Sequence, residues 1–266
     1  MKSSLKGLIK QTGLKREHIA AARMRLERNV LAALPRQSPR MSGRILCYHA
    51  VGQPELGVND ISPQRFRRQI EMAIAAGYRF VPAVDIALTG GGPKDLAITF
   101  DDALRSLRTA AAPILKDFAI PWAFFAVSDW CEKGHPWGPD VVLSWREIEA
   151  LAADGVHVGS HSATHADFGK IPPAEAEEEL IRSRDMIERR LGFAPTTFAI
   201  PLGQSMNWTP TAGALARKAG YQVIYAQAET TRPADTVART FVTCFDGDSI
   251  FKALLQGAYD SWEEWV

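Results

Sequence analysis

Strand and helix signals alternate along most of this sequence, and that alternation restricts the fold more than any other feature. From Arg44 onward, short apolar runs typical of buried strands are separated by longer segments that carry helix-capping residues. Parallel strands need crossover connections of this kind, and the helices then pack outside the sheet. The order therefore predicts an α/β protein with a barrel-like or a doubly wound fold.

Local patterns of apolar, capping and helix-ending residues place the individual elements. Ser62-Pro63 and the pair Ser144 and Glu147 are typical helix starts, and Gly192 ends a long amphipathic segment. We expect helices over residues 62–76, 107–118, 144–155, 172–191, 209–219 and 249–262, with a loop over 130–142. We expect strands over residues 45–49, 78–81, 96–100, 121–127, 156–160, 197–200, 221–226 and 239–244.

Charge is distributed unevenly along the chain. The 266 residues are 46% hydrophobic and 23% charged, which is ordinary for one sizeable globular domain. The net charge of +1 gives no electrostatic reason to expect a nucleic-acid partner. Residues 1–44, however, contain 11 Lys and Arg against two Glu, a net charge of +9 that leaves −8 for the remainder.

The basic N-terminal segment is predicted to be a separate part of the chain. Residues 1–43 read as a helical extension and linker, and residues 44–266 as the main domain. The helix is expected in two pieces over residues 1–34, interrupted at Gly13, and the stretch 35–40 has linker composition. An apolar stripe recurs at three- and four-residue spacing: Ile19, Ala22, Leu26, Val30 and Leu34. Packing on the main domain and binding to a membrane surface or partner are both open interpretations.

The cysteines and the apolar runs indicate the cellular environment. Cys47, Cys131 and Cys244 show no CxxC spacing, which favours small buried side chains over a disulfide framework or a zinc knuckle. No apolar run reaches the length of about 18 to 20 residues that spans a bilayer, and no signal-peptide pattern is present. We therefore expect a cytoplasmic protein, at the inner membrane surface if the basic helix contacts lipid.

Two adjacent carboxylates, Asp101 and Asp102, follow the predicted strand 96–100. The carboxyl ends of parallel strands are where α/β folds place their chemistry. Neighbouring carboxylates repel each other unless a positive charge compensates them, and a metal ion is the usual compensation. This pair therefore directs the search to further metal ligands.

His161 and His165 are the strongest candidates for those ligands. They are four residues apart, a spacing that lets two imidazoles hold one ion, and they follow the predicted strand 156–160. Strand ends converge at one mouth in a parallel barrel. Two imidazoles and one carboxylate would leave coordination positions for water and substrate, as in catalytic sites.

These two motifs together carry a family resemblance. Thr99-Phe100-Asp101-Asp102 followed by His161-Ser162-Ala163-Thr164-His165 resembles the first two motifs of the polysaccharide deacetylase family, also called NodB-like or carbohydrate esterase family 4. Tyr48-His49 near the domain start and Leu143-Ser144-Trp145 before the second motif are also similar to that family. The resemblance covers roughly residues 44–226.

The resemblance implies a distorted (β/α)7 barrel, here with an added N-terminal helical segment. It implies metal-dependent hydrolysis of acetyl groups on N- or O-acetylated sugars. Asp102, His161 and His165 would hold the metal, with zinc the first expectation and cobalt, nickel or manganese as alternatives. Asp101 would be the general base that takes a proton from the attacking water.

The third family motif, Arg-x-Pro-x-Gly, is only partly present. Pro201 and Gly203 match it, but Ala199 stands where the family has the arginine that orients the base. Either another group holds Asp101, or Asp101 is a poorer base. The segment 198–203 resembles a subgroup that includes biofilm-polysaccharide deacetylases, in which the N–H of Leu202 would stabilise the oxyanion.

The late histidine motif of the family has no match after residue 226. In the same subgroup an early strand supplies this histidine, so His49 is expected as the general acid for the leaving amine, with a structural histidine as the alternative. Trp137 lies in the predicted loop 130–142 and is expected to contact the sugar, because aromatic faces pack on pyranose rings. Loop packing is equally open for this side chain.

The implied substrate is an acetylated glycan or an intracellular sugar precursor. Two other functions remain open at this stage. One is a catalytically weak, glycan-binding relative, suggested by the missing arginine, and the other is a hydrolase of non-sugar amides or imides.

Overall fold

Eight strands form one parallel sheet in the computed structural model, which describes residues 16–34, 40–138 and 140–263. They are β1 (Arg44–Tyr48), β4 (Arg79–Phe80), β5 (Asp95–Phe100), β6 (Trp122–Ala126), β7 (His157–Ser160), β8 (Thr197–Ala199), β9 (Val223–Gln227) and β10 (Val237–Phe241). Two short strands, β2 (Ala50–Val51) and β3 (Asp60–Ile61), form a separate parallel pair.

Seven of these strands close into a barrel. Their spatial order is β1, β10, β9, β8, β7, β6 and β5, and the parallel pairing of β1 with β5 closes the ring. β4 pairs with the first residues of β5, outside the ring. The distorted (β/α)7 barrel expected from the sequence is therefore confirmed.

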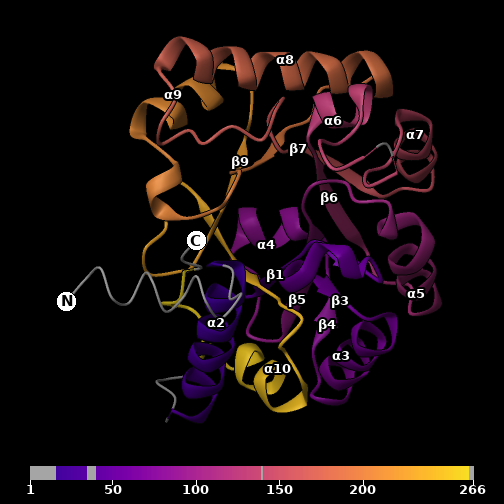
Figure 1. The fold of residues 1–266 in the computed structure, drawn as a ribbon, viewed down its shortest axis with the longest axis vertical. Helices are drawn as coiled ribbons and strands as arrows, with labels where there is room; N and C mark the ends of the chain where they lie inside the picture. The colour runs from indigo at the N-terminus through magenta and orange to yellow at the C-terminus, as the bar shows by residue number, and fades with distance from the viewer. Residues whose placement is uncertain (1–15, 35–39, 139, 264–266) are drawn as a thin grey trace, which may run out of the picture.

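Helices surround the barrel (Figure 1). They are α2 (Arg16–Ala33), α3 (Pro63–Ala75), α4 (Ala83–Thr89), α5 (Ala112–Asp117), α6 (Ser128–Lys133), α7 (Trp145–Ala153), α8 (Pro173–Leu191), α9 (Pro210–Lys218) and α10 (Asp248–Leu255). Shorter turns are η1 (Pro54–Asn59), the π-helical η2 (Leu107–Ala111) and η3 (Ser205–Asn207).

The predicted helix ends have physical causes that the structure shows directly. The Ser62 hydroxyl accepts the N–H of Arg65 at the start of α3, and Ser144 forms a capping box with Glu147 at the start of α7. α8 ends at Gly192, which adopts the left-handed conformation that glycine tolerates best.

The barrel interior is filled by side chains from its strands and closed at one end by a helix. Phe125, Ala199 and Tyr225 pack together inside, and Ala83 and Ile86 of α4 join the same cluster. These α4 residues contact the first residues of the strands, so they cover the end where the strands begin. The opposite end, where the strands finish, stays available for chemistry.

Several element predictions need correction. The predicted loop 130–142 begins inside α6, the short helix α4 was not expected, and the predicted helix 107–118 is divided into η2 and α5. The last strand is 237–241 rather than 239–244, and α10 ends at Leu255 rather than at residue 262. Short helices produce too few turns for a 3.6-residue period to be detected in sequence.

The N-terminal helix α2 packs with a different face from the one that the apolar pattern suggests. Met24 and Arg28 are its buried residues, and the Arg28 guanidinium pairs with Asp246 at 2.5 Å, with both side chains fully buried. The predicted apolar stripe faces outward: Ile19, Ala22, Leu26, Val30 and Leu34 are all exposed. The first predicted helical piece, residues 1–13, lies outside the described residues, and the domain boundary at residue 44 stays a prediction.

Two further observations concern membranes and cysteines. Within residues 16–34, 40–138 and 140–263, no helix has the length and apolarity required to cross a membrane. Cys47 and Cys131 are buried, as expected, whereas Cys244 is only half-buried; all three are free thiols.

Candidate active site

The structure brings the predicted polar residues to the end of the barrel where the strands finish. His49 directly follows β1, Asp101 and Asp102 follow β5, His161 follows β7, and Pro201 lies two residues beyond β8. These strands are all parallel, so the residues after them share one mouth. Four strand ends therefore bring these residues to the same end of the barrel.

Asp102, His161 and His165 form a three-ligand cluster. Asp102 Oδ1 lies 3.6 Å from Nε2 of His161 and 3.6 Å from Nε2 of His165. One ligand atom from each of the three residues lies within 4.8 Å of the other two. This arrangement was predicted from the sequence, and it leaves room between the three atoms for an ion.

The hydrogen bonding of His161 prepares it to be a ligand. Its Nδ1 lies 2.8 Å from the carbonyl oxygen of Ala199, which can only accept, so Nδ1 carries the proton. Nε2 therefore presents a lone pair to the cluster. Burial lowers the pKa of His161 to about 3, so the ring is neutral at physiological pH.

The chemistry of the cluster fits a divalent cation. Asp102 Oδ1 is buried and has no hydrogen-bond partner among the described residues, although it faces two imidazole nitrogens. Burial raises the pKa of Asp102 to about 6, and the charge of Asp101 adds to that effect. A bound cation would give this oxygen a partner and would offset the unfavourable burial of the ionised carboxylate. Two nitrogens and one oxygen are a donor set that zinc accepts.

The loops that present these ligands hold unusual backbone conformations. Asp102, Ser162 and His165 have φ values of 68°, 66° and 67°, in the left-handed region that residues other than glycine seldom adopt. Each such residue costs about 1 to 3 kcal/mol and persists only where its surroundings impose it. Their concentration at the predicted ligands indicates a site whose geometry is kept at the expense of stability.

Glu179, on α8, supports the histidine loop and was not predicted. Its buried carboxylate accepts the N–H of Ala163 at 3.0 Å and the N–H of Thr164 at 2.8 Å, and also the Thr164 hydroxyl at 3.0 Å. Arg182 donates to the same carboxylate from one helical turn away. Glu179 therefore fixes the backbone between the two imidazoles.

Arg239 is the second residue that sequence reasoning missed. Its guanidinium makes a bidentate ion pair with Asp101, with Nη1 2.6 Å from Oδ1 and Nη2 2.7 Å from Oδ2. Both side chains are buried, and the guanidinium lies over the rings of Phe125 and Tyr225 at 5.2 and 5.7 Å. Arg239 comes from β10, on the same inner face of the barrel.

This ion pair answers the question raised by Ala199. Ala199 is fully buried in the barrel interior beside Phe125 and Tyr225, the two rings that flank Arg239. Ala199, on β8, occupies the position where the family motif has its arginine. Arg239 instead comes from β10, which is two strands from β8 in the barrel, with β9 between them. Of the two alternatives, the structure supports the first: another group holds Asp101.

The two adjacent carboxylates have opposite electrostatic environments. Burial opposes ionisation of Asp101, but the charge of Arg239 and its hydrogen bonds outweigh burial and hold the pKa of Asp101 well below its ordinary value. The Cys47 thiol lies 3.3 Å from Asp101 Oδ2 as a donor, and burial raises the pKa of that thiol, so it stays protonated. Pairs of groups whose pKa values are driven apart are typical of acid–base sites.

His49 lies beside these carboxylates in a half-buried position. Its ring packs edge-on against Phe241 of β10 with 5.3 Å between the centroids. A positive charge on its ring would help to lower the pKa of both Asp101 and Asp102. Its Nδ1 is buried without a hydrogen-bond partner in the described part of the chain.

The predicted oxyanion segment forms a tight turn after β8. Leu202 and Gly203 have φ values of 66° and 75°, and Pro201 is buried. The Gln227 N–H donates to the carbonyl of Gly203 at 2.8 Å, and its side-chain amide donates to the carbonyl of Leu202 at 3.3 Å. A Cβ at position 203 would lie 2.9 Å from the Gln227 side chain, so glycine is required.

Trp137 connects to the metal-ligand cluster through a row of rings. The ring of Trp130 stacks on His165 at 5.2 Å, His135 lies 4.3 Å from Trp130, and Trp137 lies 5.0 Å from His135. Trp137 is 72% exposed at the end of this row. Trp137 therefore presents an aromatic face to solvent, and its contact with a sugar stays a prediction.

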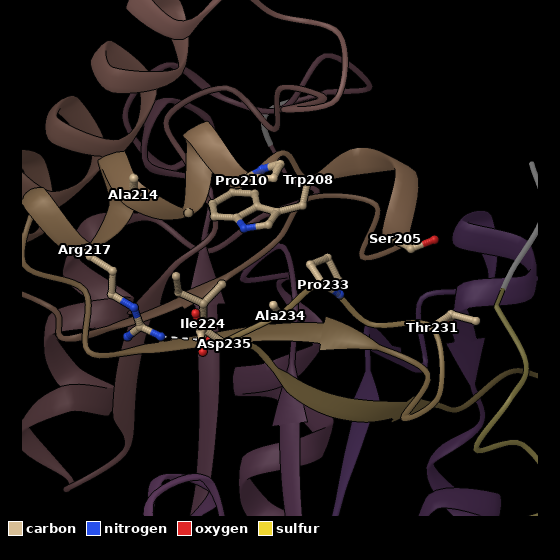
Figure 2. A pocket seen from close by; sticks show the side chains of 11 residues that line it. Ser205, Trp208, Pro210, Ala214, Arg217, Ile224, Thr231, Pro233, Ala234 and Asp235 are labelled. Carbon is tan, nitrogen blue, oxygen red and sulfur yellow. Dashed lines mark hydrogen bonds between the residues drawn. The ribbon is translucent and has the colours of Figure 1, made fainter.

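A separate pocket of about 530 Å³ lies outside the barrel, between α9 and the segment that follows β9 (Figure 2). Trp208, Pro210 and Ile224 make much of its apolar lining. Arg217 enters it but donates to backbone carbonyls, including that of Asp235. None of the predicted site residues lines this pocket, so it is distinct from the mouth.

Comparison with known proteins places the chain among deacetylases. The sequence model of the family described as "Polysaccharide deacetylase" matches residues 89–224. A chitooligosaccharide deacetylase from Bradyrhizobium sp. is 25% identical over 151 residues, 55% of this chain and 63% of that relative. The chain thus spans less than two thirds of that relative's length, and smaller shares of the other curated relatives that it matches.

Solved structures share the fold. IcaB from Ammonifex degensii is 26% identical, has a TM-score of 0.68 and covers 82% of this chain and 97% of its own. The Streptococcus pyogenes deacetylase PplD, solved in complex with acetate, has a TM-score of 0.67 at 20% identity over 82% of this chain and 98% of its own. At that identity the second likeness establishes the fold alone.

Proposed function

Because the chain belongs to the polysaccharide deacetylase family, we propose that it is a divalent-metal-dependent hydrolase that removes acetyl groups from N-acetylated sugars or polysaccharide. The observation that carries the proposal is the unpartnered Asp102 Oδ1 between two imidazole nitrogens, beside a carboxylate clamped by an arginine. A glycan-binding protein has no need for an ionised base next to a metal site.

Asp102, His161 and His165 would hold the cation, and zinc is the ion we propose. A bound divalent cation supplies a Lewis acid for the acetyl carbonyl and lowers the pKa of water. The chain contributes the donor set, the neutral state of His161 through burial, and the loop geometry that Glu179 maintains. Positions left open by three protein ligands admit water and substrate.

Asp101 would act as the general base. Arg239 keeps this carboxylate ionised at any physiological pH and fixes both of its oxygens, so it can accept a proton from water in one orientation. The strongly lowered pKa of Asp101 makes this carboxylate a weaker base, so its fixed orientation toward the water must compensate. Orientation can contribute several kcal/mol to such a step.

His49 would donate a proton to the leaving amine, with its ring oriented by Phe241. The N–H of Leu202 would stabilise the negative charge that develops on the acetyl carbonyl oxygen, and Gln227 holds the turn that carries this N–H. Trp137 would pack against a sugar ring at the exposed end of the aromatic row.

The alternative of a catalytically weak, glycan-binding relative was suggested by the missing arginine of the third motif. Arg239 supplies a guanidinium at the base in a different way, so that observation no longer favours the alternative.

Acetate release and metal content test the proposal together. The protein is loaded with zinc, cobalt, nickel or manganese, and acetate is measured with N-acetylglucosamine oligomers and with acetylated esters and amides as substrates. We expect acetate from the sugar oligomers, and loss of both bound metal and activity in the variant His161→Ala/His165→Ala. His157→Ala is the matched control, because His157 bonds to Thr197 on the neighbouring strand and should leave both readouts unchanged. Full activity of the metal-free double variant, or turnover only of non-sugar amides, would contradict the proposal.

A further inference from the structure

The outer side of α2 carries an apolar surface that nothing in the described chain covers. Ile19, Leu26 and Val30 are 44%, 66% and 51% exposed, and Leu34, just beyond the helix, is 53% exposed. They are separated by seven, four and four residues, which places them on one face of a helix. We call these four residues the outer stripe.

The inner side of α2 is fixed to the barrel, so the outer stripe has no means of turning inward. Arg28 pairs with Asp246 and donates to the carbonyl of Phe241, with no exposure of either charged side chain. The Arg28 guanidinium lies 4.2 Å from the centre of the Tyr259 ring, and the Tyr259 hydroxyl donates to the Arg28 carbonyl. Rotating the helix would break a buried ion pair, which is strongly unfavourable. α2 lies at the edge of the molecule beside α10 (Figure 1).

Charge decides which occupant suits the outer stripe. Residues 1–44 carry a net charge of +9, while the remaining residues carry −8. Residues 1–15, directly before α2, contain four lysines and no acidic residue. Arg23 lies four residues after Ile19 and three before Leu26, so it borders the stripe, and its side chain, which pairs with Glu27 at 2.5 Å, is 57% exposed. A second copy of the chain would place two strongly basic segments together, which is unfavourable.

An anionic bilayer would match both the apolar outer stripe and the positive charge of the N-terminal residues. Amphipathic helices with apolar side chains on one face and cations at its border lie in the lipid interface, with the apolar face at the boundary of the acyl chains. Each lysine or arginine near an anionic surface strengthens binding about fivefold. We propose that the outer stripe of α2 docks the protein on the surface of an anionic phospholipid bilayer.

Vesicle flotation of the full-length protein tests this interaction. The probes are vesicles of pure phosphatidylcholine and vesicles with about one third phosphatidylglycerol. We expect binding to the anionic vesicles, binding to the neutral ones that is weaker by more than about tenfold, and strong weakening by salt. Ile19→Ser/Leu26→Ser should lower the partition coefficient on anionic vesicles at least about tenfold, because the apolar contribution is removed.

The chain offers a closely matched control. Leu88 on α4 and Ile181 on α8 are 67% and 41% exposed, nearly the same as Leu26 and Ile19. Leu88→Ser/Ile181→Ser should leave vesicle binding unchanged, while the melting temperatures of both double variants remain close to that of the wild type. Equal binding of the wild type and Ile19→Ser/Leu26→Ser would overturn the proposal. So would a wild-type dimer that the same substitutions convert to a monomer, since the occupant would then be a second copy.

This inference is independent of the proposed deacetylation. Acetate release from a soluble oligosaccharide should be the same for the wild type and Ile19→Ser/Leu26→Ser, because neither residue lies at the mouth of the barrel. Loss of vesicle binding with retained hydrolysis, or the reverse, separates the two proposals.

Discussion

Arg239 carries the most demanding prediction about this molecule. Replacing it with methionine keeps much of the side-chain volume but removes the charge that compensates Asp101 inside the barrel. We expect a large loss of stability, a large loss of kcat/KM and a change in the pH profile. Each of the three effects follows from the bidentate contact at 2.6 and 2.7 Å.

The magnitude follows from the burial of both partners. Opposite charges about 4 Å apart attract by about 4 kcal/mol at an effective dielectric constant of about 20. Removing one partner of a buried ion pair costs about 3 to 5 kcal/mol, because the remaining charge is left uncompensated. For a chain of this size, each kcal/mol lowers the melting temperature by about 2 to 4 °C, so Arg239→Met should melt about 10 °C lower.

The sign of the pH dependence is fixed by the direction of the shift. In the wild type the pKa of Asp101 is held below its ordinary value, so the stabilising contribution of the pair is present above that ordinary value and is lost only in strong acid. Without Arg239, burial raises the pKa of Asp101 instead. The acidic limb of kcat/KM should therefore move to higher pH, and the stability difference from the wild type should shrink as the pH falls and the carboxyl becomes neutral.

Two further variants separate positioning from general stability. Arg239→Lys keeps the charge but not the bidentate geometry, so it should lower kcat more than it changes KM. Arg44→Met breaks the ion pair of another buried arginine with the half-buried Asp260, at the start of β1 and away from the mouth of the barrel. It should lower the melting temperature while leaving the pH profile unchanged. If Arg239→Met behaves like Arg44→Met in both readouts, the proposed role of Arg239 is wrong.

Three other predictions address the surroundings of the site. Glu179→Ala removes the acceptor for two backbone N–H groups of the histidine loop, so metal affinity measured by competition with a chelator should fall about 10- to 100-fold. His49→Gln should retain bound metal but lower kcat by about 100-fold or more, measured as acetate release; an unchanged kcat would leave His49 a structural residue. Gly159→Ala places a Cβ 2.5 Å from an aromatic ring and from a threonine hydroxyl, so it should destabilise the fold by about 1 to 3 kcal/mol in denaturant titrations. Gly247→Ala is its control, because no atom lies within 4 Å of the added Cβ.

The metal ligands could be predicted because their signal is local. Asp102 follows an apolar strand directly, and His161 and His165 share one short segment after another strand. In a parallel barrel the ends of such strands meet regardless of the details of packing. The sequence pattern therefore required only the correct fold class to bring these three residues together.

Arg239 could not be placed by the same reasoning. It acts from the middle of β10, and its partner follows β5, 138 residues earlier. The strand was expected to begin at residue 239, which would have put Arg239 at the entrance of the barrel rather than near its mouth. A charged residue inside a strand was the available signal, but one sequence does not say whether such a side chain points inward.

For α2, the apolar pattern in the sequence indicated the wrong buried face. Apolar residues at helical spacing normally mark the buried face, and Arg28 belongs to what looks like the polar face. The partner that buries Arg28 is Asp246, 218 residues away, together with the ring of Tyr259. A long-range ion pair can therefore decide the orientation of a helix against its apolar pattern.

A last prediction concerns the two positions from which a guanidinium can reach Asp101: position 199 on β8, where this chain has alanine, and position 239 on β10, where it has arginine. If the base requires only a guanidinium at one point of the barrel interior, the strand that supplies it should be interchangeable. Ala199 belongs to the same cluster as Phe125 and Tyr225, the two rings over which the Arg239 guanidinium lies. Removing the long side chain from β10 should therefore create space for a long side chain from β8.

Ala199→Arg alone should be strongly destabilising, because it crowds a packed interior and buries a second positive charge. Arg239→Ala alone should lose activity and stability for the reasons given above. The combined variant Ala199→Arg/Arg239→Ala should then melt higher than either single variant and regain part of kcat/KM, with its acidic limb returning toward that of the wild type. A combined variant whose losses are the sum of the single losses would show that the two positions do not share one site, since independent substitutions add. Recovery would mean that the position of the charge, rather than the strand that carries it, is what Asp101 requires.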